Sequence, residues 1–397
     1  MSGPLSGVRV VDVSMNVMGP FASQILGDMG ADIWKIEPPE GDTLRGVGPG
    51  RNPKMGPYYL NLNRNKRSIV LDLKRAEAGP VMRRMLERAD VVFYSLRPKA
   101  MQRLGLAYAD VRAINPRIIY CGAFGYGQNG PYADKPAYDD LMQGAIGLAV
   151  LQAPRGEPPR YVVSAIADRV VGMAAASAIG MALYHREKTG QGQAIDVPMF
   201  ETMIQFVMGD HLYGRTFEPP TGEFGYPRLL DPHRKPYPTK DGYVSVLVYN
   251  DKQWLRFFAL AGRPDLAADA RYQSMQERTK NIAALYATLN EIFATKTTAE
   301  WMRLLEEGDI PSAPLHTPQT LLEDEHVKAV NFFPLQEHPS EGRIRGFGIS
   351  SRWSESQPEV TRHAPALGEQ TTEVLRELAF SQAEIDGLIA SQTAIQR

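Results

Sequence analysis

Residues 8–36 read VRVVDVSMNVMGPFASQILGDMGADIWKI, and this stretch decides the fold. Residues 8–13 alternate as a β-strand does, a Gly-Pro pair then opens an apolar helical pattern, and Gly30 stops that pattern. A second strand-like segment follows at residues 32–36. The stretch therefore predicts a βαβ unit whose two strands are parallel and joined by a right-handed crossover.

The same alternation continues downstream and predicts an α/β fold, with an open parallel, Rossmann-like sheet in the large domain. Strand-like segments follow at residues 68–73, 90–94, 117–123 and 193–197, and helical patterns lie at residues 76–88, at residues 167–186 and from residue 198 onward. The helical pattern at 167–186 is rich in Gly, Ala and Ser, which suits close packing against another backbone.

Ligands of such sheets bind beyond the carboxyl ends of the strands, which makes the loops at residues 14–18 and 95–99 a candidate site. No G-x-G-x-x-G motif follows the first strand. A dinucleotide site is disfavoured, because the glycines that let a pyrophosphate approach the first turn are missing.

The chain has 397 residues, more than a single hydrophobic core usually supports. Residues 217–233 are rich in Pro, Gly and aromatic side chains and lack a clear period, which indicates a boundary. We expect domains at residues 1–225 and 226–325, followed by a C-terminal segment at 326–397. The smaller domain is predicted to be α+β, and the elements expected after the boundary are a strand pair near 242–248, helices near 252–260 and 282–304, a strand at 343–349 and a helix near 372–378.

Composition narrows the class of protein. The 44 Lys and Arg residues balance 45 Asp and Glu residues, which excludes a nucleic-acid binder that works by bulk charge. One cysteine, Cys121, forbids an internal disulfide and indicates a reducing compartment. The start lacks a secretory pattern, and the longest apolar run, residues 170–183, is shorter than the ~20 residues that a bilayer needs. We expect a cytoplasmic enzyme without a membrane segment.

Several catalytic chemistries lack their motif. The seven histidines are scattered, with no H-E-x-x-H, so no metal is implied. No G-x-S-x-G nucleophile elbow occurs either. Cys121 sits within an apolar strand-like segment, where a buried inert thiol is the more frequent outcome.

Asp168 lies at the start of the long apolar helix, where the presence of a carboxylate requires an explanation. A structural explanation is an N-cap or a first-turn acid that faces the helix dipole, and this is the commoner role. A catalytic explanation uses the same physics, because amide N–H groups and the positive helix end would keep a nucleophilic carboxylate ionised. Composition alone does not decide between the two.

Residues 61–68 concentrate three cations before a strand, and Arg97 and Arg103 follow the next strand. A solvated basic rim is the usual outcome of such a run. The alternative is an electropositive lip for a phosphorylated ligand, favoured by the expected position at strand ends.

These residues carry a resemblance to a known family. The class III CoA-transferases, also called the CaiB–BaiF family, are similar to this chain in blocks that keep the family's order along nearly its whole length. The blocks are residues 3–42 with DVSMNVMGPFASQILGDMGADIWKIEPPEGD, NRNKRSIVLDLK at 63–74, ADVVFYSLRPKAMQRLGL at 89–106, INPRIIYCGAFGYGQNGPY at 114–132, HREKTGQGQAIDVP at 185–198, YPTKDGYV at 237–244, GDIPSAPLHT at 308–317 and APALGEQTTEVL at 364–375.

The resemblance implies an interlocked homodimer of ring-shaped subunits, in which the C-terminal segment returns to the large domain. The family's nucleophile is an aspartate that opens the helix before an R-x-x-T-G-x-G turn, and it falls on Asp168. No permanently bound cofactor is implied, and coenzyme A is a co-substrate. The family's CoA contacts map onto Val17, Met18, Leu71, Asp72, Leu73, Lys74, Ser95, Leu96, Arg97 and Arg103, with Lys135 and Tyr138 lining the same cleft.

The implied activity is transfer of CoA from an acyl-CoA thioester to a carboxylic acid, through an aspartyl anhydride and an aspartyl-CoA thioester. A small dicarboxylate such as succinate is the expected acceptor. An acyl-CoA racemase or isomerase is the alternative, disfavoured because Tyr138 stands where that branch carries an acid/base histidine. A CoA-binding protein without turnover is a third possibility, which retention of Asp168 argues against. Arg45, Arg51, Tyr58 and Tyr59 are candidates for the acyl pocket, although solvated surface is the commoner role for each.

Overall fold

The computed structural model describes residues 3–153 and 156–397, and the chain divides into two compact units. The first unit comprises Met1–Gly147, Tyr161–Gln205 and Val330–Arg397, and the second comprises Leu148–Arg160 and Phe206–Ala329. The chain therefore leaves the first unit twice and returns to it twice. The domain boundaries expected near residues 225 and 325 stay predictions.

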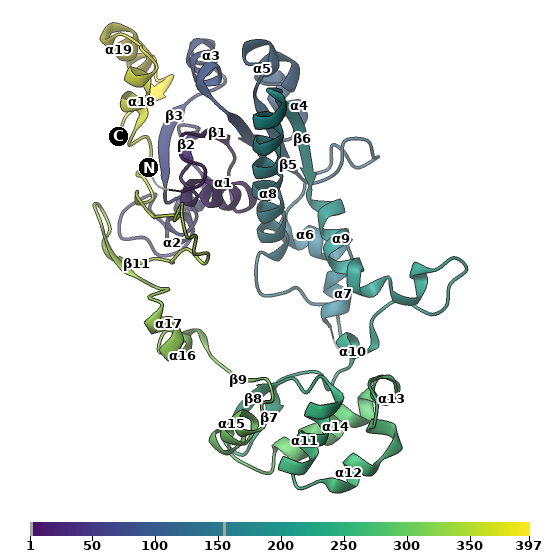
Figure 1. The fold of residues 1–397 in the computed structure, drawn as a ribbon. Coiled ribbons are helices and arrows are strands. Elements are labelled where there is room, and N and C mark those ends of the chain that lie inside the picture. Colours follow the sequence, from purple (N-terminus) through teal and green to yellow (C-terminus); the bar gives the residue numbers. More distant parts are fainter. Residues whose placement is uncertain (1–2, 154–155) are drawn as a thin grey trace. The chain divides into compact units, whose positions relative to one another are not determined.

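A seven-stranded sheet is the framework of the first unit (Figure 1). Its strands are β1 (Arg9–Val13), β2 (Asp32–Glu37), β3 (Lys66–Leu71), β4 (Val91–Tyr94), β5 (Ile119–Phe124), β6 (Gln193–Pro198) and β12 (Ala394–Ile395). The order is β12-β3-β2-β1-β4-β5-β6, and every neighbouring pair is parallel except β12 with β3. This order confirms the predicted open parallel sheet and puts the change of winding direction between β1 and β4.

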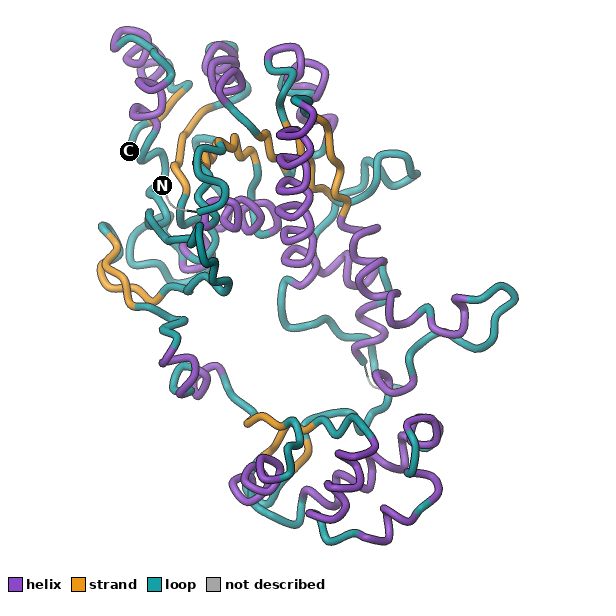
Figure 2. The backbone as a smooth tube through the Cα atoms, viewed as in Figure 1, coloured by secondary structure: helices purple, strands orange, loops and turns teal. Residues whose placement is uncertain are grey.

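Helices alternate with these strands along the chain, as Figure 2 shows by colour. The first unit contains α1 (Met18–Asp28), α2 (Pro57–Leu60), α3 (Ala78–Arg88), α4 (Pro98–Arg103), α5 (Tyr108–Ile114), α6 (Asp139–Ala145), α8 (Ile166–Thr189), α18 (Thr371–Glu377) and α19 (Gln382–Ala390), with the 3-10 helix η1 (Thr43–Gly46) and the hairpin β10 (Leu335–His338) and β11 (Gly342–Arg345). Strands β3, β4 and β5 are buried along their whole length, as the strands of a sheet covered on both faces should be.

Helix α8 packs against α1 and against strands β5 and β6. The close approach to α1 depends on Gly172, since a Cβ there would lie 2.8 Å from the carbonyl oxygen of Met18. The small residues seen in the sequence therefore do serve close backbone packing. By length and composition alone α8 is apolar enough to cross a membrane. Its packing explains that composition instead, because Ala175, Ile179 and their buried neighbours belong to the interior of the first unit.

The C-terminal segment belongs to the first unit and adds three elements that sequence patterns did not predict, β10, α19 and β12. Arg67, which is 4% exposed, ties this segment to the sheet by pairing with Asp32 and Glu377. Arg84 and Arg88 donate to backbone carbonyls at the end of α18. The predicted helix near residues 372–378 corresponds to α18, and the predicted strand at 343–349 is the shorter β11.

The second unit combines a small antiparallel sheet with short helices. Its elements are β7 (Tyr237–Pro238), β8 (Tyr243–Val246) and β9 (Ser312–Pro314), with α7 (Leu148–Gln152), α10 (Pro227–Leu230), α11 (Asp251–Leu260), α12 (Pro264–Ala268), α13 (Met275–Lys280), α14 (Ile282–Phe293), α15 (Thr298–Glu307), α16 (Pro318–Leu321) and α17 (Glu325–Ala329), and α9 (Met199–His211) runs from the first unit into it. The helix expected at 282–304 is wrong as one element. It breaks before Thr297, whose side chain forms a capping box with Glu300 and starts α15.

Substitution of Gly172 by Ala should destabilise the first unit by about 1–3 kcal/mol, because the new methyl group would collide with the backbone of α1. Gly180 on the same helix is the matched control, since a Cβ there meets nothing within 4 Å. Gly180→Ala should stabilise by up to about 1 kcal/mol through helix propensity alone. Denaturant unfolding of the two variants measures both effects, and equal free energies of unfolding would contradict the packing account.

Candidate active site

The two loops predicted to form a site lie side by side at the point where the sheet reverses direction. Strands β1 and β4 are neighbours, with Val13 beside Tyr94. Beyond their carboxyl ends the backbone N–H of Met15 donates to the hydroxyl of Ser95 over 3.2 Å. Val17 and Met18 follow at the start of α1, and both are buried. The structure thus places these residues at the carboxyl edge of the sheet, where open α/β sheets bind ligands.

A buried ion pair holds the loop after β1 in place. Lys35 and Asp42 are fully buried and lie 2.9 Å apart, Nζ to Oδ2. The Lys35 ammonium also donates to the carbonyl of Ser14 over 3.0 Å, and the other oxygen of Asp42 accepts from the amide of Asn16 over 3.2 Å. Asn16 has a left-handed backbone with φ 68°. The Lys35–Asp42 ion pair therefore holds the loop backbone at two positions, Ser14 and Asn16.

A second buried pair, Asp12 with Lys66, completes this support. One oxygen of Asp12 accepts from the amide and hydroxyl of Ser14 over 2.9 and 2.5 Å, and the other accepts from Ser23 over 2.6 Å. Lys66 lies 3.7 Å from Asp12 and donates to the carbonyl of Pro20 over 2.8 Å. Burial lowers the pKa of Lys66 to about 7, although the Asp12 charge opposes that change.

This arrangement corrects both interpretations of residues 61–68, the solvated basic rim and the electropositive lip. Arg64 forms a bidentate pair with Asp28, Lys66 points into the interior, and Arg67 joins the C-terminal segment. All three cations form ion pairs with carboxylates. Lys66 and Arg67 begin β3 at the amino end of the sheet. The three cations are structural, because they pair with the buried or half-buried carboxylates of Asp28, Asp12 and Asp32.

Four of the predicted CoA contacts line one cavity of about 860 Å³ between α3 and α4, within the usual size of a ligand site. Leu73 and Lys74 reach it after β3, Leu96 after β4, and Arg103 at the end of α4. Its walls also include Arg75, Arg83 and the apolar side chains Met82, Leu86, Leu104, Leu106 and Ile114. The cavity thus offers an apolar floor with a cationic rim.

Of the four predicted contacts at residues 71–74, two do not line this cavity. Leu71 is 1% exposed and belongs to the hydrophobic core, and its strand pairs with β12. The carboxylate of Asp72 accepts from the amide of Lys74 over 3.1 Å and pairs with Arg75 at 3.4 Å. Asp72 therefore shapes the turn that presents Lys74.

The segment before α6 contacts the loop that contains Ser95, and it leads into the helix that binds the start of α8. Arg97 donates to the carbonyl of Asp134 over 3.2 Å. The ammonium of Lys135 lies 3.6 Å from the centre of the Tyr132 ring. Tyr138 caps α6 with its side chain 65% exposed, and it immediately precedes Asp139. This segment therefore contacts the loop at residues 95–99 through Asp134. Tyr138 is one residue from Asp139, which anchors Asp168.

Asp139 and Gln143 fix the first turn of α8. The Asp139 carboxylate accepts from the amide of Asp168 over 3.0 Å and from the side chain of Gln143 over 2.6 Å. The fully buried Gln143 in turn accepts from the amide of Val162 over 2.8 Å. Part-buried hydrogen bonds from the amides of Val162 and Asp168 thereby hold the two ends of residues 162–168 against α6.

Asp168 is half-buried and lies in the first turn of α8, whose N-cap is Ala165. Burial raises the pKa of its carboxyl to about 7, the charge of Asp139 raises it further, and Arg169 opposes them. The expectation that helix amides keep this carboxylate ionised is therefore wrong for the free protein. The backbone amide of Asp168 donates to the Asp139 carboxylate, which brings a like charge close to the Asp168 carboxyl.

Sequence reasoning missed Asp139 and Gln143. Their partners lie 29 and 19 residues further along the chain, so no local spacing connects them. The available signal was the Asp-Asp pair at residues 139–140, which reads as an ordinary acidic first turn.

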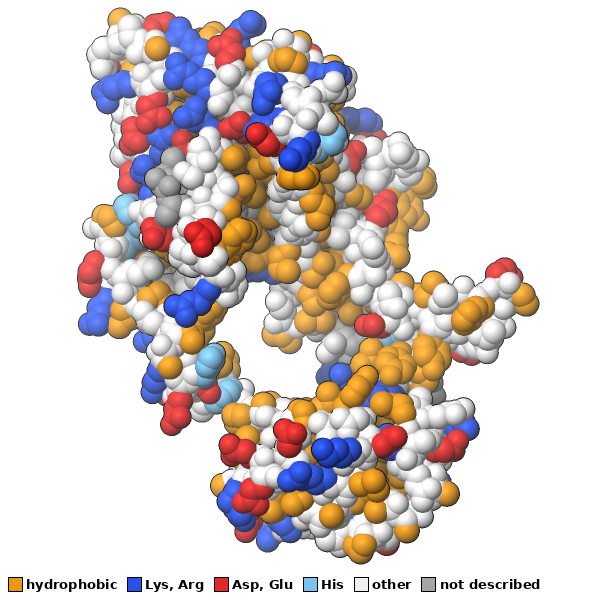
Figure 3. All heavy atoms as spheres, viewed as in Figure 1, with side chains coloured by type: hydrophobic (Ala, Val, Ile, Leu, Met, Phe, Trp, Pro, Cys, Tyr) orange, Lys and Arg blue, Asp and Glu red, His pale blue; other side chains and the backbone are white. Residues whose placement is uncertain are grey.

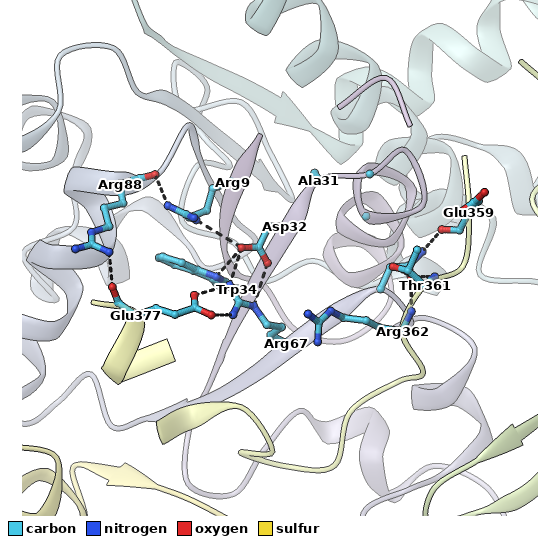
Figure 4. Close-up of a pocket in the computed structure, with 13 residues that line it drawn as sticks. Arg9, Ala31, Asp32, Trp34, Arg67, Arg88, Glu359, Thr361, Arg362 and Glu377 are labelled. Atoms are coloured by element: carbon cyan, nitrogen blue, oxygen red, sulfur yellow. Dashed lines mark hydrogen bonds and ion pairs between the residues drawn. The ribbon is translucent and has the colours of Figure 1, made fainter. Parts of the chain in front are cut away.

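A different pocket, of about 470 Å³, lies at the amino ends of the strands (Figure 4). Arg9 and Arg67 lie on the Trp34 ring there, and both pair with Asp32. Since Arg67 holds the sheet to the C-terminal segment and Arg9 donates to the carbonyl of Arg88, this pocket is architectural. Within residues 3–153 and 156–397, no three His, Cys, Asp or Glu side chains are grouped as metal ligands.

Comparison with known proteins identifies the family of this chain. The model of CoA-transferase family III matches residues 5–371. Succinate–glutarate CoA-transferase of Agrobacterium fabrum is 34% identical over 94% of this chain and 96% of its own length. Human succinyl-CoA:glutarate CoA-transferase is 30% identical over 98% and 89%. A CaiB/BaiF family protein from Brucella suis superposes with a TM-score of 0.80 at 30% identity, covering 95% of this chain and 100% of that one. The chain belongs to CoA-transferase family III, whose members are class III CoA-transferases.

Proposed function

We propose that this CoA-transferase moves CoA from an acyl-CoA thioester to a small dicarboxylic acid, with Asp168 as the nucleophile. The observation that carries the proposal is the anchoring of Asp168 on α6, in the first turn of a helix that packs against α1, the helix that follows the loop at residues 14–18. A carboxyl with a pKa of about 7 is ionised in about half of the molecules at neutral pH. It then attacks without a separate general base.

The cavity between α3 and α4 suits the nucleotide end of CoA. Its apolar floor can receive an adenine ring, and Lys74, Arg75 and Arg103 can pair with phosphate oxygens. The pantetheine arm would then pass the loops at Val17 and Ser95 toward α8. Binding energy gathered far from the thioester can in this way be used to orient the reacting groups.

The proposed chemistry proceeds by double displacement. The Asp168 carboxylate attacks the thioester carbonyl, the C–S bond breaks, and an aspartyl anhydride forms as CoA thiolate leaves. The thiolate attacks the aspartyl carbonyl and releases the acyl group as a carboxylate, leaving an aspartyl-CoA thioester. The acceptor carboxylate repeats the steps in reverse. Each carbonyl is activated covalently, so the chain itself supplies the carrier group.

A dicarboxylic acceptor is favoured by the names of several relatives, which act on succinate, glutarate or malate. Those names belong to proteins that are 30–34% identical to this chain. The acceptor of this chain is inferred from that likeness.

We also propose an interlocked homodimer in the cytoplasm. Hydrophobic side chains gather over α8 in the view of Figure 3, and Met173, Met181 and Tyr184 of this helix are more than half exposed. Exposed apolar patches of this kind commonly mark protein interfaces. Light scattering should report twice the mass of the chain, and a monomer at micromolar concentration would contradict the proposal.

Hydroxylamine added with a competent acyl-CoA should inactivate the enzyme by forming a hydroxamate at Asp168, because it intercepts the activated aspartyl carbonyl. Peptide mass spectrometry locates the adduct. Asp168→Asn should lower transfer by about a thousandfold or more while CoA binding, measured by calorimetry, persists. An adduct on another residue, or transfer by the Asn variant at the wild-type rate, would refute the role of Asp168.

The pH profile tests the electrostatics of the site. Since only the ionised carboxylate attacks, kcat/KM for acyl-CoA should rise with pH and reach half its maximum near pH 7. Asp139→Asn should move this midpoint to lower pH, because it removes a like charge. Asp140→Asn, on the neighbouring exposed residue of α6, is the matched control and should leave the midpoint in place.

The same carboxyl should affect stability with a defined sign. Its folded-state pKa is raised, so the folded protein loses stability as pH rises from about 4 to about 7. Asp168→Asn should therefore raise the melting temperature most above pH 7 and hardly at all near pH 4. A stabilisation that is equal at both pH values would show that the carboxyl keeps its ordinary pKa.

A further inference from the structure

A second cavity, of about 640 Å³, opens beside the first turn of α8 and is not used by the proposed CoA site. Ser164, four residues before Asp168, and Arg169, the residue after it, both line this cavity. The remaining wall is mainly apolar and comes from α1, from Tyr58 after the second strand, and from the C-terminal segment. The apolar side chains are Phe21, Ile25, Met29, Tyr58, Met173, Phe332, Phe347 and Ile349.

In the part of the chain that the structure describes, Arg169 brings a charge without an ion-pair partner to this apolar wall. Its guanidinium carbon lies 4.5 Å from the centre of the Phe21 ring. Among the described residues, no carboxylate lies within ion-pair distance of Arg169, and no carbonyl accepts a hydrogen bond from its side chain. A half-buried guanidinium without an anion is costly unless a ligand supplies one.

The other charged and polar groups of the cavity do not fill this role. Asp28 is already engaged by the bidentate Arg64 at 2.7 and 3.0 Å and by Asn65 at 2.8 Å. Gln24 is 6% exposed, and its side-chain oxygen is buried without a hydrogen-bond partner. The unused acceptor of Gln24 and the unpaired charge of Arg169 line the same cavity. They indicate that polar groups of this cavity lack partners among the described residues of the free protein.

We propose that this cavity receives the carbon chain of the dicarboxylic substrate and that Arg169 binds its distal carboxylate. The inference rests on the proposed function and names the group that distinguishes a dicarboxylate from a monocarboxylate. Asp168 and Arg169 are adjacent in the first turn of α8, close enough for the charge of Arg169 to act on the Asp168 carboxyl.

A planar guanidinium over an aromatic ring is a suitable anchor for this task. The Phe21 ring restricts the guanidinium, and a carboxylate can accept two parallel N–H bonds from its fork. The charge of Arg169 also acts on Asp168, since it opposes the rise of the pKa of that carboxyl. A single helical turn thus carries the attacking group and the group that holds the far end of the acid.

The test compares two acceptors of equal length, glutarate and pentanoate, with one acyl-CoA donor. In a double displacement, kcat/KM for the acceptor does not depend on the donor, so the comparison isolates acceptor recognition. Arg169→Met should lower kcat/KM for glutarate at least tenfold and leave that for pentanoate within about threefold, chiefly through KM. Arg169→Lys should recover part of the preference, because it keeps the charge and loses the fork.

Lys188→Met is the matched control. Lys188 is another cation over an aromatic ring of α8, 5.3 Å from the centre of the Tyr184 ring at the opposite end of the helix. It should leave the ratio of the two acceptors unchanged. Thermal melting of each variant verifies that the chain folds, and an unfolded Arg169→Met leaves Arg169→Lys to report on the ratio.

The outcomes separate the inference from the function on which it rests. Loss of preference for glutarate in Arg169→Met, with CoA binding intact, supports the anchor. A wild-type enzyme that transfers CoA to acids through Asp168, combined with an equal effect of Arg169→Met on both acceptors, overturns the anchor alone. A wild-type enzyme that forms no hydroxamate at Asp168 overturns the proposed function itself.

Discussion

The loop after β1 depends on charges that the interior of the sheet keeps away from water. Lys35, Asp42, Asp12 and Lys66 are all fully buried, and their charges offset one another while their remaining polar atoms hold the backbone of residues 14–20. Desolvation of such groups is expensive, and removal of one partner usually costs more than the pair contributes. The fold thereby obtains a loop with one backbone geometry at the carboxyl edge of the sheet.

Asp168 illustrates the opposite use of burial. The core pairs neutralise each other, whereas Asp139 and Asp168 place two carboxylates together with a single amide hydrogen bond between them. This arrangement disfavours the charged form and so destabilises the fold at neutral pH. Functional sites commonly retain such unfavourable electrostatics, because a more stable pairing would quench the reactive group.

The sheet could be predicted from the sequence because the patterns that indicate its strands and helices lie within short segments. Residues 8–36 contain both strands and the helix of the first βαβ unit, and the structure reproduces them within two residues at most boundaries. The α14–α15 break was missed although its Thr-x-x-Glu capping box was present. Strand β12 has two residues and pairs with Leu71 more than three hundred positions earlier, so no pattern within its own length could reveal it.

The charged residues were harder to assign for a physical reason. A cation before a strand has the same sequence signature whether it meets solvent, a phosphate or a buried carboxylate. Arg64, Lys66 and Arg67 meet carboxylates from distant elements, while Lys74 and Arg103 face an open cavity. Arg169 shows the converse, because next to Asp168 it reads as a helix-surface residue. Its significance comes from what surrounds it: an aromatic ring, an apolar wall and no described anion.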